Sequence, residues 1–166
     1  EMGQLLEAMA WLGEQPDTLF LGQSVLYPGA KMHGSLEGVP AEKRLEMPVA
    51  EALQLGISIG LALEGFVPVS IFPRINFLFC AADMLVNHLD KLPLYSDYRP
   101  KVIVRTAVGS KQPLDAGPQH TGDYSWALAQ MLSTVPVRKV ERGEGAVGVY
   151  RYAYEGSCST LVVEEG

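Results

Sequence analysis

Five short and largely apolar runs, separated by segments with helical periodicity, constrain the fold of this chain most strongly. The runs cover residues 18–21, 67–72, 101–106, 135–140 and 160–163. Helices are predicted over residues 4–13, 51–64, 77–91, 124–132 and 145–154. Continuously apolar strands that alternate with helices indicate a parallel sheet with both faces covered. We therefore predict an α/β fold: a single three-layer domain over residues 1–166, with a mostly parallel sheet and helices on both faces.

The composition limits the classes of function. A chain of 166 residues with 48% hydrophobic content can bury one full core. Its formal net charge of -6 argues against nucleic acid, which needs clustered Lys and Arg. The apolar region 51–72 is interrupted by Glu64, Gly65 and Pro68 before it reaches the length of a membrane span. We therefore expect no nucleic-acid partner and no membrane association.

Cysteine usage and the start of the chain bear on the compartment. Cys80 and Cys158 are isolated, which is typical of a reducing compartment, and we expect both to be buried as small hydrophobic residues. Residues 1–14 are predicted to form an amphipathic helix rather than a signal peptide. The expectation is a soluble, cytoplasmic protein.

Two long segments rich in Gly and Pro are candidate functional loops. They cover residues 23–43 and 107–121, and loops of that length in a compact domain are usually functional or disordered. Ligands of parallel sheets bind beyond the carboxyl ends of the strands. We expect both loops, and the turn that precedes residue 51, to meet at that edge.

Glu51 is the strongest single candidate for chemistry. It stands in the first turn of a predicted helix whose remaining residues are almost all small or apolar. An exposed acid there would simply complement the helix dipole, with a gain of a few tenths to about 1 kcal/mol. Because Val49, Ala50 and Leu53 surround it, we expect Glu51 to be partly buried, where a carboxyl needs a partner or a proton. Such carboxyls are candidate acid–base groups.

Two other patterns have weaker support. The run Gly56-Ile57-Ser58-Ile59-Gly60 matches the GxSxG nucleophile elbow, but an elbow needs a strand directly before the serine, and here helix formers precede it. The three histidines, His33, His88 and His120, are too dispersed to predict a metal site. His120 ends the second long loop, where a turn leading into the next helix and a functional role are about equally supported by spacing.

The order of several motifs resembles the pyrimidine-binding domain of thiamine diphosphate enzymes. The motifs are Leu21-Gly22 after a strand, PVAE at 48–51, FPRINFLFCAAD at 72–83, KVIVRT at 101–106 and QHTGD at 119–123. The chain looks most similar to the beta subunits of the decarboxylating component of 2-oxo-acid dehydrogenases. It is more distantly similar to the middle domain of transketolase.

The resemblance implies roles for individual residues. The glutamate that matches Glu51 bonds N1′ of the cofactor's aminopyrimidine, and a poorly solvated carboxyl can share that proton. Phe77 matches the aromatic residue that stacks on the pyrimidine, and His120 matches a histidine that contacts the substrate or assists proton transfer. Phe72 and Phe79 are candidates to line the same pocket, although core packing is the role we favour for both. Gln23, where many relatives carry an acidic residue, is a further candidate cofactor contact.

The resemblance also implies a partner. The family binds the diphosphate and its magnesium through a separate domain with a Gly-Asp-Gly motif, which this sequence does not contain, and we predict no metal ligands in this chain. We expect a hetero-oligomer, a dimer of heterodimers, that shares thiamine diphosphate across an interface formed by residues such as Leu85, Val86 and Leu89. The predicted substrate is a small carbonyl compound, with a 2-oxo acid as first choice. A ketose donor, as in transketolase, and a non-catalytic regulatory or assembly subunit are the alternatives.

Overall fold

The described residues form one parallel sheet, as the sequence predicts, with six strands where five were expected. The computed structural model describes residues 2–28, 31–111, 115–140 and 145–165. The strands lie in the order β2-β1-β3-β4-β6-β5, and each neighbouring pair is parallel. Their bounds are β1 Thr18–Gly22, β2 Arg44–Glu46, β3 Val67–Phe72, β4 Ile103–Ala107, β5 Val137–Val140 and β6 Thr160–Glu164.

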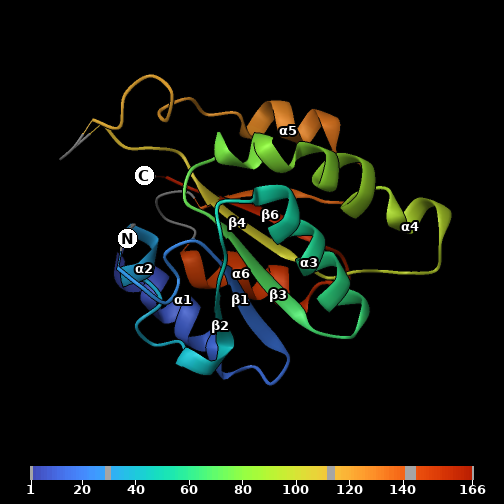
Figure 1. Ribbon diagram of the computed structural model, residues 1–166, viewed down its shortest axis with the longest axis horizontal. Helices are drawn as coiled ribbons and strands as arrows, with labels where there is room; N and C mark the ends of the chain where they lie inside the picture. The colour runs from blue at the N-terminus through green and yellow to red at the C-terminus, as the bar shows by residue number, and fades with distance from the viewer. Residues whose placement is uncertain (1, 29–30, 112–114, 141–144, 166) are drawn as a thin grey trace.

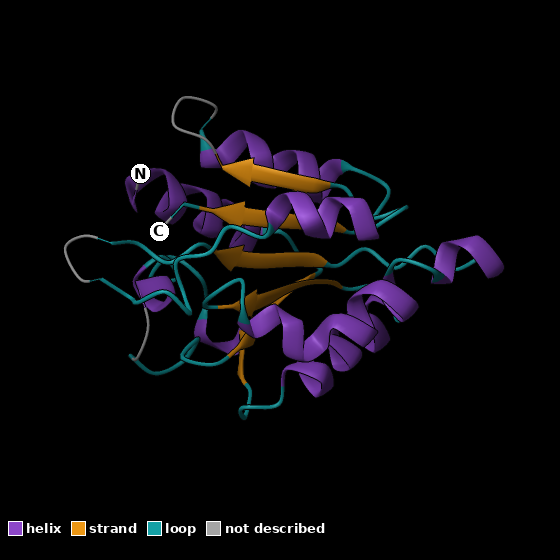
Figure 2. Cartoon of the chain, turned by 90° about the horizontal axis from the view of Figure 1, so that it is seen from above, coloured by secondary structure: helices purple, strands orange, loops and turns teal. Residues whose placement is uncertain are grey.

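Helices cover both faces of the sheet, which confirms the three-layer prediction (Figures 1 and 2). One core cluster joins α1 and α6 to the sheet, and the other joins α3, η2, η3 and α5 to the opposite face. All six residues of β3 are buried, because side chains of a strand alternate between faces and both faces are covered. The helical elements are α1 Met2–Glu14, α2 Lys31–Gly34, η1 Ala41–Lys43, α3 Glu51–Leu63, η2 Phe77–Ala81, η3 Met84–Leu89, α4 Leu92–Tyr95, α5 Ser125–Met131 and α6 Ala146–Glu155.

The first predicted loop contains regular structure that its sequence did not indicate. It holds α2 and η1, and the edge strand β2 follows directly and pairs with β1. β2 has only three residues, Arg44, Leu45 and Glu46, and this short, charged composition is typical of an edge strand. Residues 29–30 of this loop and 112–114 of the second loop lie outside the described residues.

The predicted helix 77–91 is divided into two elements of different pitch. η2 is a 3-10 helix and η3 is a π-helix. Leu85 and Leu89 are buried in the core between η3 and the sheet, so the prediction that they form a contact surface for a partner is wrong. The prediction that both cysteines are buried is also wrong, because Cys80 is exposed and Cys158 is only half-buried.

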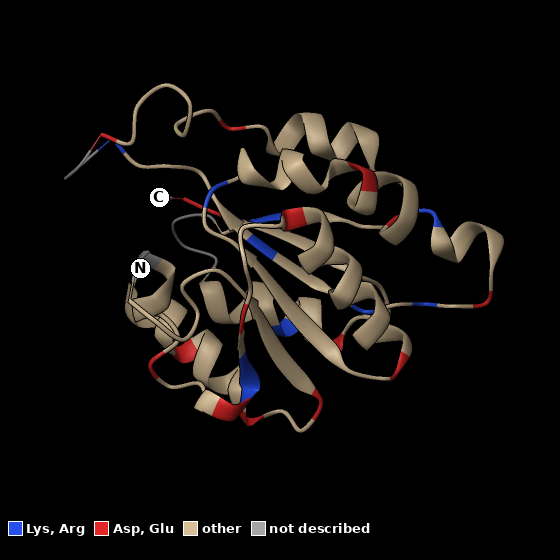
Figure 3. Cartoon of the chain, in the orientation of Figure 1, with Lys and Arg blue, Asp and Glu red and all other residues tan. Residues whose placement is uncertain are grey.

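α3 carries no charged residue between its first residue and its end (Figure 3). Gln54, Leu55, Ser58 and Ile59 form its buried side. Leu53 and Ile57, four residues apart, lie on the outer side and are exposed. An uncharged helix with an exposed apolar side is unusual for a surface and indicates a binding face.

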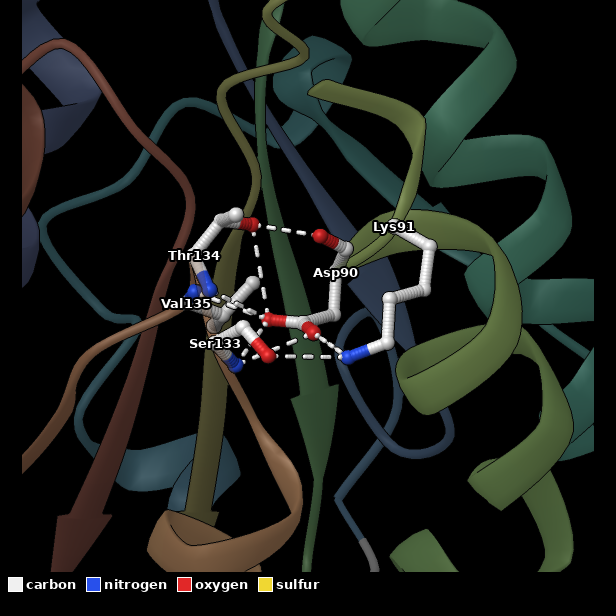
Figure 4. A network of polar contacts seen from close by, with 5 residues as sticks. All are labelled: Asp90, Lys91, Ser133, Thr134 and Val135. Atoms are coloured by element: carbon white, nitrogen blue, oxygen red, sulfur yellow. Dashed lines mark hydrogen bonds and ion pairs between the residues drawn. The ribbon is translucent and has the colours of Figure 1, made fainter. Parts of the chain in front are cut away.

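Asp90, directly after η3, fixes the segment that leads into β5 (Figure 4). Its fully buried carboxylate accepts hydrogen bonds from the backbone N–H groups of Ser133, Thr134 and Val135, at 2.7–3.0 Å. Lys91 Nζ donates to the same carboxylate at 2.5 Å. Burial raises the pKa of Asp90, but these hydrogen bonds outweigh burial and lower it overall.

The carboxyl ends of the strands gather the candidate residues at one edge, as predicted. Glu51 begins α3 shortly after β2, Phe77 begins η2 shortly after β3, and His120 lies in the loop after β4. Backbone hydrogen bonds join these connections: Met47 N–H donates to Gly22 O, and Ile75 N–H donates to Ala107 O, both at 2.8 Å. The sheet edge thus brings together segments that are far apart in sequence.

Candidate active site

Glu51 is half-buried at the head of α3, which confirms the predicted partial burial. Its neighbours are more exposed than expected: Val49 is 79% and Leu53 is 53% exposed. Within the part of the chain that the structure describes, the Glu51 carboxylate has neither a hydrogen-bond partner nor an ion pair. It is therefore free to accept a hydrogen bond from a ligand that lies against the start of α3.

Gln54 fixes the first turn of α3 to the sheet, a role that the sequence analysis missed. Its buried side-chain amide donates to Ile71 O at 2.9 Å, to Ser70 Oγ at 3.2 Å and to Leu21 O at 3.4 Å. Leu21 and Ser70 are partners across β1 and β3, so Gln54 joins the helix to both strands. The available signal was a long uncharged polar side chain on a helix side that otherwise holds Leu55, Ser58 and Ile59.

His120 and Phe77 are in contact, although they are 43 positions apart in sequence. Their ring centroids lie 5.4 Å apart, with 66° between the ring planes, which is an edge-to-face arrangement. His120 Nδ1 also lies 3.0 Å from Oδ1 of Asn76, the residue before Phe77. The structure thus brings together two of the predicted site residues and adds Asn76, which the sequence analysis did not single out.

The backbone around His120 is closely packed. Gly109 N–H donates to His120 O at 2.8 Å, and His120 N–H donates to Gly117 O at 3.0 Å. A Cβ atom at Gly109 would lie 2.4 Å from His120 O and 2.8 Å from Nη1 of Arg74, so no other residue fits there without a shift. Gly109 therefore lets the second loop approach the end of β4 and helps to set the position of His120.

Glu46, at the end of β2, shapes the loop that carries Gln23. Its carboxylate accepts backbone hydrogen bonds from Ser24, Val25 and Leu26, at 2.5, 2.9 and 2.8 Å. Burial raises the pKa of Glu46, but these backbone hydrogen bonds lower it overall. Ser24 adopts a φ of 57°, an uncommon conformation for a residue other than glycine. Gln23 is half-buried beside this turn.

Phe72 has the core-packing role that we favoured for both residues, whereas Phe79 does not. Phe72 is 1% exposed within the core cluster beneath α3, so in this chain it packs in the core and offers almost no surface to a ligand. Phe79, for which we favoured core packing, is 45% exposed and lies edge-on to Tyr124, with ring centroids 5.0 Å apart. The prediction that Phe72 lines the pocket is not supported by this burial.

The other sequence patterns have structural roles. Ser58 is fully buried in the middle of α3 and donates its hydroxyl proton to Gln54 O at 2.9 Å, so it is not a nucleophile elbow. His88 is exposed and lies 3.4 Å from the Asp83 carboxylate. Among the described residues, no group of three His, Cys, Asp or Glu side chains could hold a metal ion.

The outer sides of α3, η2 and α5 expose large apolar side chains. We call these residues the outer apolar surface: Leu53, Ile57, Phe79, Trp126 and Met131. Trp126 is 75% exposed, which is costly for a side chain of that size in water. This surface replaces Leu85 and Leu89 as the structural candidate for a partner contact.

Sequence comparisons connect the chain to enzymes of known class. It is 30% identical over 169 aligned positions to "Pyruvate dehydrogenase E1 component subunit beta, mitochondrial" of Chaetomium thermophilum, which covers 96% of this chain and 43% of that protein. It is 36% identical over 76 residues to "3-methyl-2-oxobutanoate dehydrogenase subunit beta" of Mycobacterium tuberculosis, covering 44% of this chain and 22% of that protein. A rice relative, "Pyruvate dehydrogenase E1 component subunit beta-2, mitochondrial", is 28% identical over 132 residues, covering 78% of this chain and 34% of that protein.

A structural comparison supports the same fold. A solved structure described as "Split gene transketolase, inactive beta4 tetramer" superimposes with a TM-score of 0.74 at 18% identity, over 97% of this chain and 49% of that one. No family model matches the sequence. The chain spans less than half the length of these relatives. In its described part, every helix is too short or too polar to traverse a bilayer. Fold and sequence relatives together identify the chain as a transketolase-like pyrimidine-binding domain related to the beta subunits of 2-oxo-acid dehydrogenase E1 components.

Proposed function

We propose that residues 1–166 bind the aminopyrimidine ring of thiamine diphosphate and form the beta-type half of an enzyme active site. The observation that supports this proposal most strongly is the state of the Glu51 carboxylate, which is half-buried and has no partner among the described residues. It lies at the sheet edge where Phe77 and His120 are in contact. A carboxylate in this position needs a hydrogen-bond donor, and a protonated ring nitrogen is one. The thiamine diphosphate dependence of the related enzymes supports this choice of ligand.

Each residue has a distinct task in this proposal. Glu51 shares a proton with the pyrimidine nitrogen through a hydrogen bond. The Phe77 ring, half-buried and held by His120, offers a face on which a flat heterocycle can stack. His120 moves a proton to or from the substrate, and Gln23 contacts the cofactor from the loop after β1. The bound cofactor supplies the electron sink for cleaving a carbon–carbon bond next to a carbonyl.

We propose that the site is completed by a second chain that binds the diphosphate and its Mg²⁺. The five exposed large apolar side chains of the outer apolar surface support this proposal, because a partner chain would remove them from water. The assembly is then a hetero-oligomer, a dimer of heterodimers, in which α3 approaches the partner. The pyruvate and 3-methyl-2-oxobutanoate dehydrogenase names of the relatives support this arrangement, because they describe beta subunits.

The favoured substrate is a 2-oxo acid, which is decarboxylated before its acyl or aldehyde group is transferred. The names of the sequence relatives support it. Transfer of a two-carbon unit from a ketose is the second candidate, and the split-gene transketolase favours it through the fold. Carbon dioxide release from pyruvate and glycolaldehyde transfer from a sugar phosphate distinguish the two reactions. If the assembled enzyme shows neither, the third alternative, a regulatory or assembly subunit, is favoured.

The test of this function is the Glu51→Gln variant in the complete enzyme, coexpressed with a partner that carries the Gly-Asp-Gly motif. Loss of the shared proton should lower kcat by about 10²–10⁴-fold, while assembly measured by size-exclusion chromatography stays intact. Glu64→Gln is the matched control, because Glu64 is an exposed carboxylate at the other end of the same helix. Unchanged turnover in Glu51→Gln would exclude the proposed role.

The cellular location stays a prediction. The cytoplasm was the expectation from the sequence, whereas the Chaetomium and rice relatives are named as mitochondrial. Cell fractionation with an antibody against the native chain decides between the two compartments.

A further inference from the structure

We propose that Asn76 is the positioning residue of His120. Its amide oxygen holds the imidazole proton on Nδ1 and leaves Nε2 as the nitrogen that is available to a ligand. The tautomer follows from the geometry of this chain alone, and only its catalytic consequence rests on the function proposed above.

The contact joins two connections that are distant in sequence. Asn76 precedes η2 in the connection after β3, and its Oδ1 lies 3.0 Å from Nδ1 of His120, in the loop after β4. The next residue, Phe77, packs against the same imidazole at 5.4 Å between ring centroids. Because Gly109 and Gly117 also bind the backbone of His120, its ring is restrained in both position and rotation.

The chemistry of an amide oxygen decides the tautomer. A carbonyl oxygen can only accept a hydrogen bond, so the nitrogen that faces it must carry a proton. In a neutral imidazole with its proton on Nδ1, the Nε2 atom has a free lone pair. The same amide oxygen can keep its hydrogen bond when the ring is protonated, so His120 can accept and release a proton at Nε2 without turning. Within the described ranges, Nε2 of His120 has no hydrogen-bond partner.

Several charged groups lie around this loop. Arg74 Nη1 lies close to Gly109, the Asp123 carboxylate is paired with Lys139 Nζ at 2.8 Å, and Asp115 accepts the Gly117 N–H at 2.8 Å. Among the described residues, none of these groups contacts the His120 imidazole. Asn76 is therefore the contact that determines which ring nitrogen carries the proton.

The direct test is the tautomer of each histidine in the purified, ¹⁵N-labelled chain, read from long-range ¹⁵N–¹H correlation spectra at a pH where the rings are neutral. The sequence contains three histidines, and a His120→Gln variant assigns the signal of interest. We expect His120 to carry its proton on Nδ1. His33 and His88 are internal references for the opposite tautomer, because their Nε2 atoms face Leu26 O and the Asp83 carboxylate, each at 3.4 Å.

Two variants separate positioning from general structural support. Asn76→Ala removes the acceptor and should shift His120 towards the Nε2–H tautomer, whereas Asn76→Asp keeps an acceptor oxygen and should retain the Nδ1–H tautomer. Asn87→Ala is the matched control, because Asn87 is an exposed asparagine whose amide donates to the Asp83 carboxylate at 2.8 Å. Circular dichroism checks that each variant is folded. An Nε2–H tautomer in the unmodified chain, or an unchanged tautomer in a folded Asn76→Ala chain, would overturn the proposal.

The assembled enzyme provides the second measurement. Asn76→Ala should lower kcat by about 10–100-fold with a smaller change in KM, and Asn76→Asp should restore part of kcat. If the tautomer shifts as expected but kcat is unchanged in both Asn76→Ala and His120→Gln, the positioning by Asn76 stands and the catalytic role given to His120 fails.

Discussion

Buried polar side chains fix the connections of this domain to its sheet. Gln54 joins α3 to β1 and β3, Asp90 joins the end of η3 to the segment before β5, and Glu46 holds the turn after β1. Each side chain satisfies backbone or hydroxyl groups that would otherwise be left without partners away from water. The loops that carry candidate site residues are therefore held by specific hydrogen bonds as well as by apolar contacts.

Asp90 offers a sharp test of this view. The Asp90 carboxylate accepts hydrogen bonds from three backbone N–H groups and from Lys91, and the single amide oxygen of Asp90→Asn cannot replace all of them. We therefore expect the free energy of unfolding to fall by about 2–4 kcal/mol. Urea denaturation at neutral pH measures the loss. Asp97→Asn is the control, because Asp97 is exposed, and a similar loss there would contradict the assignment.

The same carboxylate predicts a pH dependence. The folded state lowers the pKa of Asp90 below its ordinary value of 3.8, so its stabilisation is complete above that value and is lost as the pH falls through the folded pKa. The stability difference between the native chain and Asp90→Asn should therefore shrink as the pH is lowered below 3.8. A difference that stays constant down to pH 2 would show that the carboxylate charge is not the cause.

At the residue scale, the positions of the candidate residues in the fold were predicted better than their contacts. Glu51, Phe77 and His120 lie at the predicted edge, because motif order and the parallel sheet determine where each connection emerges. Asn76 and Gln54 were missed, because Asn76 meets His120 of a distant loop and Gln54 meets the strands β1 and β3, and neither approach can be read from one sequence. Phe72 and Phe79 differ in burial because Phe72 ends the central strand β3, whereas Phe79 lies in the 3-10 helix η2, whose buried residues are Leu78 and Ala81.

At the element scale, strands with continuous apolar runs were predicted closely. β3 has the predicted bounds of 67–72, and β1 and β6 each extend one residue further than expected. β2 was missed because three residues with two charges carry no strand pattern. In η2 and η3 the buried residues are Leu78, Ala81, Leu85 and Leu89. This spacing, in steps of three and four, is that of a regular α-helix, so the division into a 3-10 helix and a π-helix could not be predicted from it.

The outer side of α3 leads to a prediction about assembly. Gly60 is exposed in the helix and a Cβ atom there would meet nothing within 4 Å, so Gly60→Ala should stabilise the isolated chain by up to about 1 kcal/mol. If α3 packs closely against the partner, the added methyl group should weaken assembly, measured by sedimentation with the partner chain. Gly148→Ala is the matched control, because Gly148 is an equally open helix position in α6, on the other face of the sheet. Equal effects of both variants on assembly would exclude α3 as the contact.

At the scale of the whole molecule, the parallel sheet places the Glu51 carboxylate at the same edge as the other candidate site residues. All six strands end at the same edge, so α3, η2 and the loop after β4 present Glu51, Phe77 and His120 together. The proposed active site, shared with a second chain, rests on this arrangement.

A structure of the complete enzyme with bound thiamine diphosphate tests the central claim most directly. The account predicts a Glu51 carboxylate oxygen within about 2.6–3.2 Å of the pyrimidine ring nitrogen, with the Phe77 ring against the pyrimidine face. A Glu51 side chain that points into bulk water, or that forms an ion pair away from the interface between the two chains, would contradict it.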